Sequence, residues 1–186
     1  MISMVELMKM TKQTLKEEKS FRDNVLSQLS ERGTVGAETE IFLRNRNVLL
    51  KFHRQKHSAA AWTLNGNIQI NHELIPKSIA LDNPTLLSLV VHEARHLQQG
   101  ILTALSVYGE LDAWQVGFRF YQEMTGAPLN PVLQEILTMP LNWSRTVLKE
   151  AAILMKRYSP GYRIDLLPLY PIQHEIAWWI SRKEPK

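Results

Sequence analysis

The strongest constraint on the fold is a helix whose two ends are marked in the sequence. Asn83 is a good N-cap because its side-chain oxygen can accept hydrogen bonds from the first turn, and Pro84 fits the first helical position. Gly100 fits the position just past the helix, where the backbone often becomes left-handed. These residues predict one helix over residues 84–99, roughly 24 Å long at 1.5 Å per residue.

This helix contains two histidines four residues apart, in the sequence His92-Glu93-Ala94-Arg95-His96. Residues four apart lie on one face of a helix, so both imidazoles can reach one ion at about 2.0–2.1 Å. The histidines lie on one flank of the apolar arc of the helix, at the border between core and solvent. Glu93 lies between them and that arc, where it can accept a proton without binding the ion. The segment predicts His92 and His96 as metal ligands and Glu93 as a general base.

Composition limits the other ligands and the kind of protein. The chain has 186 residues, 45% hydrophobic and 22% charged, so we expect a single domain over residues 1–186. It has no cysteine, so a metal must be held by His, Asp or Glu. The first residues lack the apolar core of a secretory signal, and no run approaches the roughly 18 apolar residues of a spanning helix. We therefore expect a cytoplasmic protein with no membrane partner.

A catalytic zinc site usually takes three protein ligands, and the third must come from another segment. Glu110 and Asp112 are the candidates. If a helix began directly after Gly100, Glu110 would lie about 15 Å along it and would miss the histidines. A loop over residues 100–105, with Ser106 as N-cap, places Glu110 in the first turn instead. Asp112 lies about 200° around the same helix, so only one of the two carboxylates can face the ion.

Helices are predicted on both sides of a small sheet. Asn65-Gly66, between two alternating apolar runs in residues 35–72, predicts an antiparallel hairpin. We expect a three-residue loop over residues 65–67 that places Trp62 opposite Ile70, because a one-residue slip would expose an apolar face. Trp178 and Trp179 should pack the last helix into the core, and an exposed interface is the alternative. Apolar spacing and glycine or proline breaks predict helices near residues 5–32, 106–125, 131–138, 142–157 and 172–182.

HExxH followed by Glu110-Leu111-Asp112-Ala113 resembles the gluzincin branch of zinc metallopeptidases, the thermolysin-like clan, and particularly its minimal single-domain members. In that clan a glutamate helix supplies the third ligand, often as ExxA, so the resemblance implies Glu110 rather than Asp112. The similarity covers about residues 45–125. It implies an α+β, zincin-like fold in which a small antiparallel sheet packs on an active-site helix and a glutamate helix, with additional N- and C-terminal helices.

The resemblance also implies a function, the hydrolysis of peptide bonds with Zn²⁺ as cofactor and a peptide or protein as substrate. Zinc polarises the scissile carbonyl and lowers the pKa of a water, from which Glu93 takes a proton. An edge strand before the active-site helix would bind the substrate through its backbone, here at Asn67, Gln69 and Asn71. The clan adds a His or Tyr that hydrogen-bonds the oxyanion, and the sequence leaves this residue open among Tyr108, Tyr121, Tyr158, Tyr162, Tyr170 and His174. Partners that orient the histidines are also expected, with Asp112 and Glu123 as candidates.

Two other readings remain. The first is a non-catalytic, zinc-stabilised binding module that uses the same ligands. The second is a nucleic-acid-binding protein, suggested by the formal charge of +4 and the basic stretch Arg44–His57, which includes Lys56. On a strand these basic residues would fall on both faces, with Phe52 as the only aromatic, so we expect a solvated surface and not a nucleic-acid partner.

Overall fold

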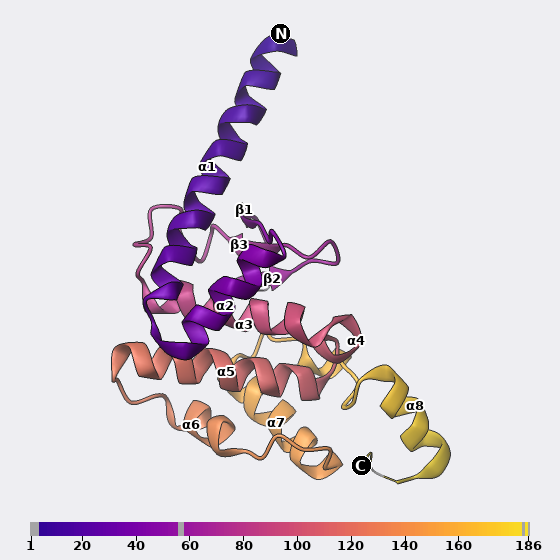
Figure 1. The fold of residues 1–186 in the computed structure, drawn as a ribbon. Coiled ribbons are helices and arrows are strands. Elements are labelled where there is room, and N and C mark those ends of the chain that lie inside the picture. Colours follow the sequence, from indigo (N-terminus) through magenta and orange to yellow (C-terminus); the bar gives the residue numbers. More distant parts are fainter. Residues whose placement is uncertain (1–3, 56–57, 184, 186) are drawn as a thin grey trace.

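The computed structural model describes residues 4–55, 58–183 and 185, with side chains from residue 13 onward; Lys56 and His57 lie outside the described residues. This part of the chain is α+β, with eight α-helices, one 3₁₀ turn and a three-stranded mixed sheet (Figure 1). The elements are α1 (Met4–Ser30), α2 (Gly33–Asn45), β1 (Leu50–His53), β2 (Ala60–Trp62), β3 (Ile68–Asn71), α3 (Pro84–Gln99), α4 (Ile101–Ala104), α5 (Val107–Thr125), α6 (Pro131–Thr138), α7 (Arg145–Tyr158), η1 (Ile164–Leu166) and α8 (Ile172–Ser181).

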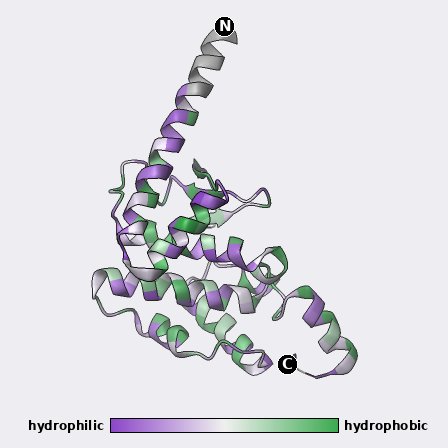
Figure 2. Cartoon of the chain, in the orientation of Figure 1, coloured by the Kyte–Doolittle hydropathy of each residue, from purple (hydrophilic) through white to green (hydrophobic). Residues whose placement is uncertain are grey.

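Helix α2 corrects the prediction that residues after 35 form only sheet. Its buried residues are Gly36, Thr39 and Leu43, and Val35 and Phe42 pack against the core beside them, so small and polar residues interrupt its apolar face. A Cβ on Gly36 would lie 2.3 Å from the backbone oxygen of Leu29, so glycine allows α1 and α2 to pack closely. Figure 2 shows hydrophilic residues along the protruding part of α1 and hydrophobic ones where α1 and α2 meet the sheet.

The sheet has the strand order β1-β3-β2, with β1 parallel and β2 antiparallel to β3. The prediction of a purely antiparallel sheet is therefore wrong. The prediction that Asn67, Gln69 and Asn71 belong to an edge strand is also wrong, because the apolar strand β1 pairs with β3 and makes β3 the inner strand. The Asn71 side chain holds the loop between β1 and β2, because its amide donates to the backbone oxygens of Gln55 and Ser58, each at 3.0 Å. The edge strand that contacts α3 is β2.

In the hairpin between β2 and β3, the partner of each β2 residue lies two residues earlier in β3 than predicted. Trp62 lies opposite Ile68, and the backbone N–H of Thr63 donates to the oxygen of Asn67 at 2.8 Å. The three-residue loop is therefore residues 64–66 rather than 65–67. Such loops need a left-handed residue at their last position, and Gly66 supplies it with φ 78°.

Helices α3 and α5 run side by side through the middle of the molecule (Figure 1). The bounds of α3 agree with the prediction, and the Asn83 side chain accepts from the backbone N–H groups of Thr85 and Leu86. Ser106 caps α5 as predicted by accepting from Gly109. The segment predicted as a loop contains the one-turn helix α4 instead. A Cβ on Gly117 would lie 3.2 Å from the Cβ of His92, so glycine lets α5 approach α3 at the metal-ligand segment.

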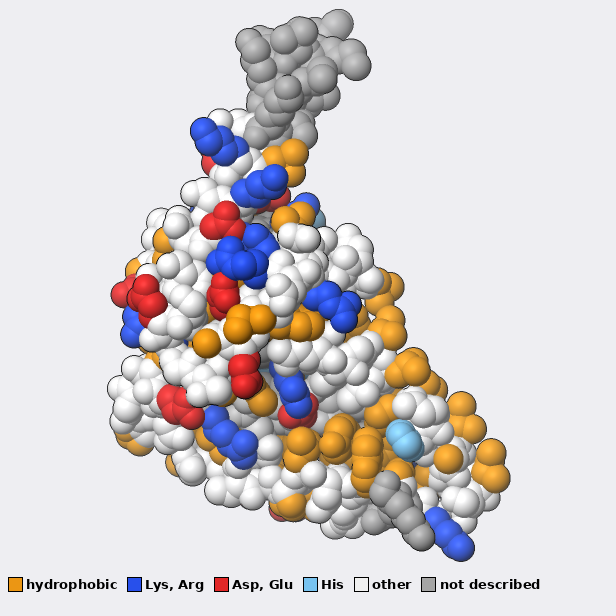
Figure 3. All heavy atoms as spheres, viewed as in Figure 1, with side chains coloured by type: hydrophobic (Ala, Val, Ile, Leu, Met, Phe, Trp, Pro, Cys, Tyr) orange, Lys and Arg blue, Asp and Glu red, His pale blue; other side chains and the backbone are white. Residues whose placement is uncertain are grey.

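Two hydrophobic clusters lie on opposite sides of this helix pair. One joins α1, α2, the sheet, α3 and Phe120 of α5, and the other joins α5, α6, α7, η1 and Tyr170. Trp178 packs against the second cluster, but Trp179 is 56% exposed, so only half of the predicted tryptophan pair is in the core. Figure 3 shows apolar side chains gathered at the end of the molecule that carries α4 and α8. In the part of the chain that the structure describes, no helix is long and apolar enough to cross a membrane.

Candidate metal centre

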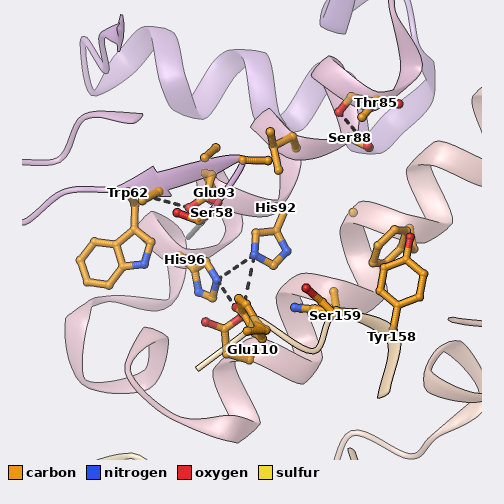
Figure 4. Close-up of a pocket in the computed structure, with 18 residues that line it drawn as sticks. Ser58, Trp62, Thr85, Ser88, His92, Glu93, His96, Glu110, Tyr158 and Ser159 are labelled. Atoms are coloured by element: carbon orange, nitrogen blue, oxygen red, sulfur yellow. Dashed lines mark hydrogen bonds and ion pairs between the residues drawn. The ribbon is translucent and has the colours of Figure 1, made fainter. Parts of the chain in front are cut away.

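Three side chains from α3 and α5 point at one another, and they are the three predicted ligands (Figure 4). The Nε2 atoms of His92 and His96 lie 3.1 Å apart, and Oε2 of Glu110 lies 3.8 Å and 3.4 Å from them. Donor atoms that bind one ion tetrahedrally at about 2.0–2.2 Å lie roughly 3.3–3.5 Å from one another. His92, His96 and Glu110 therefore form a group that can hold a metal ion with little movement.

A chain of hydrogen bonds behind the ligands orients His96. Its Nδ1 lies 3.3 Å from Oε1 of Gln99, whose Nε2 donates to Asp112 at 2.6 Å and to the oxygen of Gly109 at 2.9 Å. Arg95 holds Asp112 from the other side, with Nε 2.7 Å from Oδ2. Because Oε1 can only accept, Nδ1 of His96 carries a proton, and Nε2 is the ring nitrogen that faces the ligand group. Asp112 supports the histidine, as predicted, but through Gln99.

Glu123 does not share this role. It is exposed on α5, about 20 Å along the helix from Glu110. The prediction that it orients a histidine is therefore wrong.

The charges of the site favour a bound cation. Burial, together with the charge of the neighbouring His96, lowers the pKa of His92 to about 4. Burial acts in the same direction on His96, but its hydrogen bond to Glu110 and the charge of that carboxylate outweigh it and raise the pKa. Burial would raise the pKa of Glu110, yet the hydrogen bond and charge of His96 hold it below the ordinary value. A carboxylate thus faces one neutral imidazole, that of His92, and one that readily takes up an extra proton, that of His96. A metal cation can take the place of that extra proton.

Glu93 lies beside the ligands but outside their group. It is only 5% exposed, and one carboxylate oxygen accepts a hydrogen bond of 2.8 Å from the backbone N–H of Trp62 in β2 (Figure 4). Burial raises its pKa to about 7. A carboxyl group with a pKa near neutrality can both take up and release a proton at physiological pH, which suits an acid–base role.

The ligands and Glu93 open into a cleft of about 460 Å³. Strand β2 forms one wall, α3 and α5 form the floor, and Tyr158, Ser159 and Tyr162 form the opposite wall. The hydroxyl of Tyr162 donates to Oε2 of Glu110 at 2.5 Å. Of the six residues that the sequence left open, Tyr162 is thus the one that the structure places against a predicted ligand. Tyr158 also lines the cleft, whereas Tyr108 stacks on Trp143 and Tyr170 is buried in the second cluster.

The edge of β2 that faces the cleft has backbone groups that do not pair with β3. The hydrogen bonds to β3 involve Thr63 and Ala59. Because bonded and non-bonded positions alternate in an antiparallel pair, the backbone groups of Ala60 and Trp62 point away from β3. The contact of the Trp62 N–H with Glu93 agrees with this direction. Sequence reasoning missed this edge, although the small side chains of residues 59–61 beside the hairpin indicate room for a close neighbour.

The fold and the site define an α+β protein with a His–His–Glu group capable of holding a metal ion. Comparison with protein-family models, with curated proteins and with solved structures gives no match. The functional assignment therefore depends on the site.

Proposed function

We propose that this protein is a zinc-dependent peptidase. The observation that carries the proposal is the convergence of His92, His96 and Glu110 on one point, with the buried Glu93 beside them in an open cleft. Two imidazoles and one carboxylate form a ligand set typical of catalytic zinc, and they leave a coordination position for water or substrate. Bound there, zinc would polarise a substrate carbonyl and lower the pKa of a water molecule.

Glu93 is the residue we assign to proton transfer. Its carboxylate would take the proton of the attacking water and deliver it to the leaving amine. The hydrogen bond from the Trp62 N–H fixes the orientation of the carboxylate, and the pKa of about 7 lets it alternate between the two states. Removal of such a base typically lowers a rate by 10²–10⁴-fold.

Strand β2 is the element we assign to substrate binding. The backbone oxygens of Ala60 and Trp62 and the N–H of Ala60 face away from β3 along the cleft, where an extended peptide can add to the sheet by main-chain hydrogen bonds. A peptide bound in this way would have its scissile bond close to the ligands. A strand edge next to the site favours a peptide over a compact substrate.

Tyr162 is the residue we assign to positioning Glu110. Its hydroxyl donates to the same carboxylate oxygen that faces both histidines. A phenol in this place holds the ligand and can also donate to a developing oxyanion in the cleft.

The test compares the wild type with Glu93→Gln, and with Glu123→Gln as the matched control on the exposed face of α5. The proposal expects all three proteins to bind zinc stoichiometrically by metal analysis, and expects Glu93→Gln alone to lose hydrolysis of a broad peptide library. A wild type that binds zinc but cleaves no peptide would favour the non-catalytic binding module. Protein purified without metal that also fails to take up added zinc would refute both zinc functions.

A further inference from the structure

Six exposed apolar side chains of α4 and α8 and a seventh from the residue that follows α4 form one surface at an end of the molecule (Figure 3). The two helices contact each other, so the side chains belong to one continuous area. Each is between 46% and 81% exposed. We call this area the α4–α8 surface, and its residues are Ile101, Leu102, Leu105, Ile172, Ile176, Trp179 and Ile180.

Helix α8 exposes its apolar face and buries its one acidic residue, the reverse of an ordinary surface helix. Its one acidic residue, Glu175, is buried and pairs with Arg145 of α7 at 3.0 Å. The same guanidinium lies 3.8 Å from the ring centre of Trp178, on the same side of α8. The outward face repeats apolar residues at the helical spacing of Ile172, Ile176, Trp179 and Ile180. A helix on the surface of a water-soluble domain normally places its apolar stripe inward, so this outward stripe indicates an apolar partner.

The charged residues beside the α4–α8 surface indicate that the partner is negatively charged. Arg182 and Lys183 follow α8 directly and are exposed. The guanidinium of Arg182 lies 4.6 Å from the ring centre of Trp179, which puts a cation and an indole at the same end of the stripe. Neither α4 nor α8 has an exposed acidic residue. A second copy of the chain would therefore bring two more cations and no carboxylate from these helices.

We infer that the α4–α8 surface docks on an anionic lipid bilayer. Helix α8 would lie in the plane of the interface, with its isoleucines and Trp179 toward the acyl chains and Arg182 and Lys183 among acidic headgroups. This proposal departs from the expectation of no membrane partner, which depended on the lack of a spanning helix. A helix that lies on a membrane needs only one apolar face.

The test measures co-sedimentation of the full chain with vesicles of phosphatidylcholine and phosphatidylglycerol in equal amounts, and with vesicles of phosphatidylcholine alone. The wild type should bind the anionic vesicles more strongly, and added salt should weaken that binding. Trp179→Ser with Ile180→Ser should lower the partition coefficient at least about tenfold. Arg182→Gln with Lys183→Gln should lower it roughly thirtyfold, from about 1 kcal/mol per basic residue.

The control variant combines Leu64→Ser and Ile153→Ser, which remove two exposed apolar side chains elsewhere on the surface. It should bind vesicles as the wild type does, and circular dichroism should show every variant folded. Absence of the wild type from the vesicle pellet would overturn the inference, as would equal loss of binding in the control. A dimer that Trp179→Ser with Ile180→Ser dissociates, found by sedimentation without any vesicle binding, would assign the surface to a second copy instead.

Discussion

Replacing Glu93 by glutamine should change how the stability of the metal-free protein depends on pH. Burial raises the pKa of this carboxyl from the ordinary 4.5 to about 7 in the folded state. Below pH 4.5 the folded and unfolded chains both keep the proton. As the pH rises from 4.5 toward 7 the unfolded chain releases it first, which favours unfolding. At 1.36 kcal/mol for each pH unit, the wild type should lose about 3 kcal/mol of unfolding free energy relative to Glu93→Gln across this window.

The two proteins must be compared as a difference, because His92 acts in the opposite direction. Its pKa is lowered from 6.5 to about 4, chiefly by burial, so its contribution to stability grows as the pH rises through that range. Both proteins keep His92, and glutamine keeps an oxygen that can accept from Trp62. Urea unfolding followed by tryptophan fluorescence, with a chelator present and from about pH 4 to about pH 8, gives the free energies.

One outcome of this comparison would contradict the prediction. If the difference in unfolding free energy between the two proteins stays constant over this pH range, the Glu93 carboxyl is not desolvated in the fold, and its assignment as a near-neutral base is wrong. Glu123→Gln controls for the chemical change from carboxylate to amide at an exposed position.

Three further predictions concern the ligand support, the packing and the ion. Gln99→Ala removes the partner of a histidine and should weaken zinc affinity by about 10–100-fold in a competition with a chromophoric chelator, whereas the exposed Gln98→Ala should not. Gly109→Ala would place a Cβ 2.0 Å from the backbone oxygen of Thr103 and should lower the free energy of unfolding by about 1–3 kcal/mol in a urea titration, whereas Gly161→Ala, with open space around its Cβ, should leave it unchanged. Zinc at a hundredfold excess over its Kd should stabilise the fold by about 2.7 kcal/mol, seen as a rise in Tm that a chelator reverses; an unchanged Tm would contradict the ligand assignment.

The helices were predictable where their ends are encoded locally. Asn83 with Pro84 and Asn130 with Pro131 place a capping side chain and a first-turn proline next to each other, and the observed helices begin at those prolines. Ser106 caps α5 without a proline after it, and the start of α5 at Val107 puts Glu110 in the first turn beside the histidines. The two histidines could be predicted from their spacing within a capped helix, whereas Glu110 was selected over Asp112 only by the resemblance to the gluzincin ExxA segment.

The sheet could not be predicted in the same way, because its order depends on contacts between distant segments. Nothing within β3 indicates that β1 will pair with it in parallel and remove its free edge. The hydrogen bonds around the ligands show the same limit. Gln99 is supported by Asp112, 13 residues away, and Tyr162 reaches Glu110 across 52 residues. Such partners are chosen by packing, and spacing along the chain does not reveal them.

The two sides of the cleft come from different parts of the chain, and this separates two properties that many sites combine. All three ligands belong to α3 and α5, whose close packing at Gly117 fixes their distances. The opposite wall comes from residues 158–162, at the end of α7 and just beyond it, and contacts the ligand group through Tyr162. Substitutions elsewhere in that wall can alter what fits the cleft while the geometry that holds the ion is preserved. If the proposed function holds, the substrate selectivity of the cleft can therefore change in evolution without a change in the group of His92, His96 and Glu110.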